Sequence, residues 1–175
     1  YNKDETTGIR KEGTEPVADM SGTTGQNLNI SNIKFEGFKT AITNYETGVV
    51  NLENVEFSSN ALDIYNLGKL NLKGKNTFTN GIGGKDSLGE MSIINGKTIS
   101  NSEINQQKVT INDIASLTVD ADHLKSVTTN NGELNLGKGT LAYKVTGAGK
   151  TYISAGTEEN KNKFSLADNV TIEQN

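Results

Sequence analysis

The feature that most constrains this chain is a short apolar-polar-apolar triplet that follows a turn and recurs about every 20 residues. Eight copies occur, and their starting positions are separated by 22, 20, 21, 18, 25, 17 and 19 residues. Self-similarity at such a period is typical of solenoid proteins, in which each repeat forms one coil. The triplets are Leu28-Asn29-Ile30, Val50-Asn51-Leu52, Leu70-Asn71-Leu72, Met91-Ser92-Ile93, Val109-Thr110-Ile111, Leu134-Asn135-Leu136, Thr151-Tyr152-Ile153 and Val170-Thr171-Ile172.

The positions of the triplet differ in a way that predicts a strand with one buried face. Its third residue is Ile or Leu in every copy, whereas its middle residue is Asn, Ser, Thr or Tyr. Side chains alternate across a strand, so the outer two residues face the core and the middle one faces solvent. A glycine precedes five copies by two residues, where a corner needs positive φ or close backbone approach. These are Gly48, Gly68, Gly89, Gly132 and Gly149.

Two further columns of apolar residues predict three strands per coil. The second column lies seven or eight residues downstream of the start of each of the first six triplets and consists of Phe35, Phe57, Phe78, Ile99, Leu117 and Leu141. A third short strand is indicated by Ala41-Ile42, Ala61-Leu62-x-Ile64 and Gly81-Ile82. The phrases "NLGKLNL" (66–72) and "NNGELNL" (130–136) begin 64 residues apart, which we interpret as three coils.

These patterns predict an all-β fold, a right-handed single-stranded parallel β-helix (β-solenoid) of about eight coils over residues 26–175. Residues 1–25 break the pattern and are expected to be an irregular N-terminal segment or cap. The right hand follows from the rule for parallel crossovers. Because the last triplet stands three residues from the end, we expect a longer parent solenoid. The alternative is an antiparallel sandwich with hairpin turns at "NNGE" and "ING", but it does not explain phenylalanines spaced by 22 and 21 residues.

The coil pattern of residues 28–175 resembles the passenger domains of bacterial type V autotransporters and related surface adhesins. "FSSN" (57–60) is similar to the F-x-x-N element of chlamydial polymorphic outer-membrane proteins, although the companion G-G-A-[ILV] element is absent. The lack of cysteine is similar to many passengers, which cross the outer membrane unfolded. The resemblance implies an extracellular or cell-surface position and a non-enzymatic role in adhesion and virulence, as a binding module or stalk. Its partner would be a glycan or protein of a host or neighbouring cell.

Charge and hydropathy exclude two classes of partner. The net charge is −4, with 17 basic residues scattered among 21 acidic ones, so no basic face is expected to bind nucleic acid. No run approaches the 18 apolar residues of a membrane span, so we expect no direct membrane insertion.

The rival function is a pectin-lyase-like β-helix that binds or processes glycans, including the phage tailspike type. Lyases of this kind need a basic residue to take a proton, and hydrolases need paired carboxylates. The single arginine, Arg10, lies in the irregular N-terminal segment, and we expect no catalytic residue and no cofactor.

The densest polar cluster is "VDADH" (119–123). On a strand, Asp120 and Asp122 would project from the same face about 7 Å apart, where they can bind calcium, act on a glycosidic bond, or form a solvated strand face. His123 has the opposite parity and no second His or Cys to complete a zinc site, so we expect a surface residue and no metal site.

The remaining candidates lie in turns and at outward positions. "GIGGKDSLGE" (81–90) is expected to be a turn, and a lone cation at Asp86 is the alternative. Asn29, Asn51 and Asn71 should stack as a hydrogen-bonded amide ladder. Tyr45 and Tyr65, expected one coil apart at a corner, form the predicted ligand-binding patch, because tyrosine rings stack on ligands and their hydroxyls form hydrogen bonds.

Overall fold

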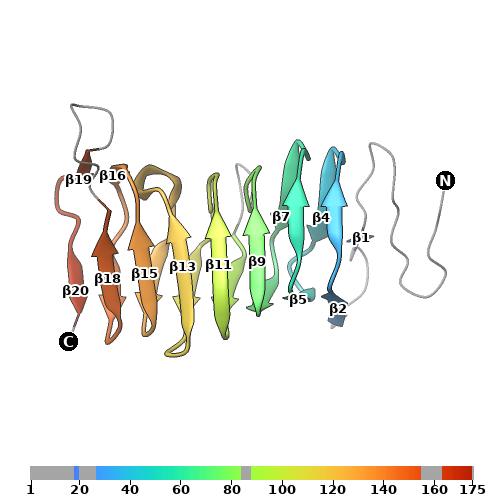
Figure 1. The fold of residues 1–175 in the computed structure, drawn as a ribbon, viewed down its shortest axis with the longest axis horizontal. Helices are drawn as coiled ribbons and strands as arrows, with labels where there is room; N and C mark the ends of the chain where they lie inside the picture. The colour runs from blue at the N-terminus through green and yellow to red at the C-terminus, as the bar shows by residue number, and fades with distance from the viewer. Residues whose placement is uncertain (1–17, 20–26, 84–87, 155–162, 175) are drawn as a thin grey trace.

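The computed structural model describes residues 18–19, 27–83, 88–154 and 163–174. These residues form short strands and one three-residue 3-10 helix, η1 (Ala121–His123). The strands pair in parallel along the length of a solenoid (Figure 1). Every ladder between described strands is parallel, which excludes the antiparallel sandwich and confirms the β-solenoid.

The solenoid has three sides, which the chain visits in a fixed order. The first side is an eight-stranded sheet: β2 (Asn27–Ser31), β5 (Val49–Glu53), β8 (Lys69–Lys73), β10 (Glu90–Ile93), β12 (Lys108–Ile111), β14 (Val127–Asn130), β17 (Val145–Gly147) and β20 (Ile172–Gln174). The second is a seven-stranded sheet: β3 (Lys34–Glu36), β6 (Glu56–Ser58), β9 (Lys75–Phe78), β11 (Gly96–Ser100), β13 (Ala115–Val119), β15 (Glu133–Leu136) and β18 (Lys150–Ile153).

The third side is less regular. It contains β1 (Ala18–Asp19), β4 (Thr40–Asn44) and β7 (Leu62–Asn66), followed by single bridges that join Ile64 to Ile82, Ile82 to Ile104 and Ile104 to Leu124. It continues through η1 to β16 (Gly139–Leu141) and β19 (Phe164–Leu166). The third strand expected at 41–42 and 61–64 is therefore present as β4 and β7, whereas at 81–82 only Ile82 forms an isolated bridge. β1, which lies inside the expected N-terminal segment, pairs with β4.

The coil is right-handed, as expected. In Figure 1 the second-side strands nearest the viewer rise, the first-side strands behind them descend, and the chain advances from β2 toward β20 at the left. About six turns are present, slightly fewer than the eight expected.

The core is a set of side-chain stacks that run along the solenoid axis. Phe57 lies between Phe35 and Phe78, with ring centroids 5.1 and 5.0 Å apart and nearly parallel planes. The stack exists because the strands pair in register, Phe35 opposite Phe57. On the third side, the side chains at each bridge position are buried: Ile42, Ile64, Ile82, Ile104 and Leu124.

Beyond Phe78 the second column differs from the prediction. Ser100 pairs with Phe78, and the column continues through Val119 and Leu136. Ile99 was expected to face inward, but it is partly exposed on the outer face because its neighbours Thr98 and Ser100 take the inward positions. Two other expected members are buried elsewhere: Leu117 opposite Thr98, and Leu141 on the third side in β16.

The interpretation of the two similar phrases is wrong. Leu70 of the first phrase lies in β8 on the first side, whereas Leu134 of the second phrase lies in β15 on the second side, opposite Leu117. Thr151-Tyr152-Ile153 likewise belongs to β18 on the second side. The first side passes instead through β14, whose inward residues Thr128 and Asn130 are polar and so do not fit an apolar triplet.

The last triplet is also displaced. β20 begins at Ile172, which pairs with Val145, so Ile172 occupies the first inward position and not the third. Val170 precedes the strand.

The five glycines predicted at corners are required by the close approach of neighbouring atoms and not by positive φ. A Cβ atom at Gly68 would lie 2.3 Å from the carbonyl oxygen of Gly48, and one at Gly132 would lie 2.1 Å from that of Asn112. No real Cβ contact is that short, so each coil approaches the next too closely for any side chain at these positions.

Asparagine ladders link the coils on the outside and the inside. On the outer face Asn51 donates to Asn29 at 2.9 Å and Asn71 donates to Asn51 at 2.8 Å, which confirms the predicted ladder. A buried row was not predicted: Asn44 donates to Asn66 at 2.7 Å, and Asn66 donates to Gln106 at 2.5 Å. Both rows tie together residues from different coils.

Candidate functional sites

The two tyrosines of the predicted patch lie on neighbouring coils without facing each other. Thr43 is opposite Tyr65 in the β4–β7 ladder, so Tyr45 lies two residues farther along its coil. Tyr45 follows β4 and is 38% exposed, whereas Tyr65, within β7, is partly buried. The aromatic ring contacts among the described residues all join phenylalanines, so none joins the rings of Tyr45 and Tyr65.

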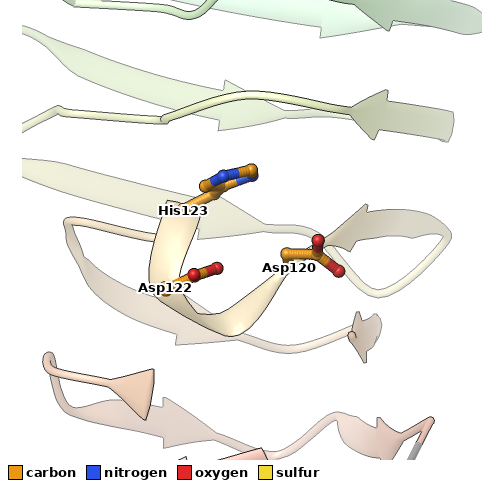
Figure 2. Close-up of side chains that lie close together, drawn as sticks. All are labelled: Asp120, Asp122 and His123. Carbon is orange, nitrogen blue, oxygen red and sulfur yellow. The ribbon is translucent and has the colours of Figure 1, made fainter. Parts of the chain in front are cut away.

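Asp120, Asp122 and His123 converge, contrary to the strand geometry expected for them (Figure 2). β13 ends at Val119, and the chain then turns into η1, so the alternation of a strand no longer applies. One ligand atom from each of the three side chains lies within 4.8 Å of the others. The expected separation of about 7 Å and the opposite orientation of His123 are therefore both wrong.

The surroundings of this cluster restrict what it can bind. Asp122 is exposed and the other two side chains are partly buried. The carboxylates lie against the next coil, where a Cβ atom at Gly137 would come within 2.0 Å of Asp120 Oδ1. His123 Nδ1 is buried without a hydrogen-bond partner among the described atoms. Two carboxylates and an imidazole supply three ligands for a divalent cation, fewer than the six to eight oxygen atoms that calcium takes.

A groove lies at the corner between the first and second sides, near the C-terminal end of the described coils. Its volume is about 440 Å³, and Gly96, Gly132 and Gly149 line it together with larger side chains. Ile114 and Tyr152 are the most exposed of these large side chains, at 71% and 47%. We call this the glycine groove. The sequence pattern placed Tyr152 in a triplet of the first side, which is the wrong side of the coil. The pair Gly132 and Gly149, 17 residues apart, was the signal for the corner.

One buried carboxylate lies outside the Asp120–Asp122–His123 cluster and outside the glycine groove. Asp63 is fully buried on the third side, and its oxygen atoms accept hydrogen bonds from the backbone N–H groups of Thr79 and Asn80 and from the side chain of Asn60. Burial raises the pKa of Asp63 above its ordinary value of 3.8, although these hydrogen bonds oppose the rise. Because Asp63 joins β7 to the 79–80 turn of the next coil, its role is structural.

Several expectations fall outside the described part of the chain. Arg10 and Asp86 lie there, so the proposed lone cation site at Asp86 has no structural test. Within the described ranges, no helix has the length and hydropathy needed to cross a membrane.

Comparison with known proteins found no matching family model, no matching curated protein and no matching solved structure.

Proposed function

We propose that this chain is a non-enzymatic binding or stalk module of a secreted or cell-surface protein of the adhesin-passenger type. Its ligand is a glycan or protein on a host or neighbouring cell. Nucleic acid is disfavoured by the negative net charge of −4.

The observation that carries this proposal is the outer face of the eight-stranded sheet. The ladders align one outward residue from each of the eight strands, and the first seven are small, polar and uncharged. Such a row is well hydrated, and its single carboxylate, at the C-terminal end, is paired with Lys144, which suits a stalk or a broad contact surface better than a catalytic centre. The row consists of Asn29, Asn51, Asn71, Ser92, Thr110, Thr129, Thr146 and Glu173.

Accessibility on intact cells tests the location. Antibodies raised against the purified chain should label intact cells of the organism that produces it, and protease added outside should remove the label. Labelling that appears only after lysis contradicts the proposal. Binding of the purified chain to immobilised extracellular-matrix proteins, with and without calcium, then distinguishes a binding module from a stalk.

The rival function, glycan processing, is favoured by one observation: the convergence of Asp120 and Asp122 on the outside of the coil. Paired carboxylates at short distance are what glycoside hydrolysis requires. The test is release of reducing ends from polygalacturonate and from bacterial surface polysaccharide. Activity that disappears in both Asp120→Asn and Asp122→Asn would establish the rival, and our proposal expects no release.

A further inference from the structure

The glycine groove lies at a corner where two glycines cannot be replaced. Gly132 cannot accept a Cβ atom, which would lie 2.1 Å from the carbonyl oxygen of Asn112, and at Gly149 a Cβ atom would lie 2.4 Å from that of Gly132. Both glycines line the groove together with their larger neighbours. Hydrogen bonds hold the corner, since Gly149 donates to Asn130 at 2.8 Å and Lys150 donates to Gly132 at 2.8 Å.

The turn that carries Ile114 is also held in place. Ile114 N–H is bonded to Asp113 Oδ1 at 3.0 Å, and Ala115 N–H is bonded to Asn112 O at 3.0 Å. Ile114 therefore lines the groove from an ordered turn, and its side chain is 71% exposed. A large exposed aliphatic side chain in an ordered turn is a ready contact for a ligand.

Polar residues of the neighbouring strand lie next to Tyr152. Asn135 lies opposite Tyr152 in the β15–β18 ladder, and Glu133 lies opposite Lys150. Asn135 Nδ2 donates to Glu133 Oε1 at 2.8 Å, so this carboxylate and amide already hold each other in position. An exposed aromatic face beside ordered acceptors and donors can contact the apolar and the hydroxyl-bearing parts of one molecule together.

These features match a saccharide better than other ligands. A sugar ring presents a C–H face that stacks on an aromatic ring and hydroxyl groups that bond to carboxylate and amide groups. The groove volume of about 440 Å³ is in the usual range for small-molecule sites. Asp113 and Glu133 contribute two negative charges against one positive charge from Lys150, so a sialylated or phosphorylated ligand would be repelled.

We infer that the glycine groove is a binding site for a neutral saccharide, with Tyr152 as the stacking platform and Glu133, which Asn135 holds in position, as the hydroxyl-binding group. The inference rests on the proposed binding function and names the ligand class and the place. It differs from the sequence-based prediction, which placed the contact patch at Tyr45 and Tyr65.

The test uses the whole chain and saturation-transfer NMR with four neutral saccharides: maltotriose, cellotriose, chitotriose and lactose. At least one should receive saturation, chiefly at its ring C–H protons. The Tyr152→Ala variant should weaken that binding about tenfold, the size expected for loss of one aromatic stack. Tyr152→Phe should keep most of it. The matched control is Tyr143→Ala, because Tyr143 is 40% exposed and does not line the groove.

A second variant in the groove shows whether weaker binding comes from lost contacts or from misfolding. Glu133→Gln preserves size on an exposed position and should weaken binding, while circular dichroism confirms that each variant is folded. 3′-Sialyllactose should bind more weakly than lactose, since it adds a negative charge.

The outcomes separate this inference from the proposed function. Equal binding by Tyr152→Ala and the parent chain overturns the inference, as does the absence of saturation transfer from all four saccharides. If the chain then still binds matrix proteins, the proposed function stands and only the saccharide site is lost. Stronger binding of 3′-sialyllactose than of lactose also contradicts the site as described.

Discussion

Three phenylalanines stack in the core, and the middle one has a ring on each face. Phe57 is fully buried, and its neighbours Phe35 and Phe78 come from the coils before and after. Offset stacking of this kind adds about 0.5–1.5 kcal/mol per pair beyond the burial of apolar area. Loss of Phe57 therefore removes two ring contacts at once and leaves a cavity between coils.

We expect Phe57→Ala to lower the free energy of unfolding by about 3–5 kcal/mol. Urea titration followed by circular dichroism measures it. The control is Leu88→Ala, whose side chain is 64% exposed and should change stability by less than about 0.5 kcal/mol. Similar losses in the two variants would contradict the stacked core.

Asp63 should make stability depend on pH. Because its folded pKa is raised above the ordinary 3.8, the folded state binds the proton more tightly than the unfolded state. The stability due to this group is therefore highest below pH 3.8 and falls as the pH rises through the folded pKa. In Asp63→Asn this change should be absent. The measurement is the difference in unfolding free energy between parent and variant from pH 3 to pH 7, which removes the effect of the other carboxylates. A difference that does not vary with pH, or that favours the parent more as pH rises, would refute it.

At the scale of the elements, the corners fix how closely one coil approaches the next. Gly68 lies at such a corner, where two backbone carbonyl oxygens, those of Gly48 and Tyr45, would lie within 2.4 Å of an added Cβ atom. Neither oxygen belongs to a flexible side chain, so the coils would have to separate.

We expect Gly68→Ala to destabilise the fold by about 1–3 kcal/mol, the usual cost of overpacking. The comparison is Gly37→Ala, which meets no atom within 4 Å but has φ of +79°, so it tests backbone strain alone. That strain costs about 1 kcal/mol. Thermal unfolding of both variants is the measurement, and a larger loss at Gly37 than at Gly68 would show that close approach does not limit this corner.

The sequence predicted the elements well where the core is apolar. From Leu28 to Ile111 the triplets lie on one sheet, because each inward position there is aliphatic or Met. The prediction fails at β14, where the inward Thr128 and Asn130 are polar and the nearest apolar triplet belongs to the next side. Periodicity identifies strands, but it does not identify the side of the coil to which a strand belongs.

The candidate sites were harder to predict for a related reason. The convergence of Asp120 and His123 depends on where β13 ends. If the strand were longer or shorter by one residue, different side chains would meet. The glycine groove depends on three corners brought together by stacking, which no single stretch of sequence contains. Tyr45 and Tyr65 could be placed on neighbouring coils from their spacing, but not in register.

At the scale of the whole molecule, each coil contacts mainly the coils before and after it. The strongest contacts between elements join successive strands of one side, such as β4 with β7 and β11 with β13. Stability in such an array is approximately a sum of coil terms and nearest-neighbour terms. A local defect should therefore weaken its own region first.

Hydrogen exchange tests this locality. In Phe57→Ala, amide protection should fall most in β3, β6 and β9, which contain or flank the lost ring, while β14 and β17 keep most of theirs. The parent chain under the same conditions is the reference. An equal fall in all strands would instead show that the solenoid opens as one cooperative unit.

The direction of the ladder hydrogen bonds has a mechanical consequence. They run between coils, parallel to the solenoid axis, since each strand pairs with its equivalents in the coils before and after it. A force that pulls the two ends apart acts along these bonds and opens them a few at a time, as in unzipping, instead of shearing a whole sheet at once. Each coil of about 20 residues that unravels adds up to about 70 Å of extended chain. Under load the protein would yield in small successive steps and act as an extensible tether.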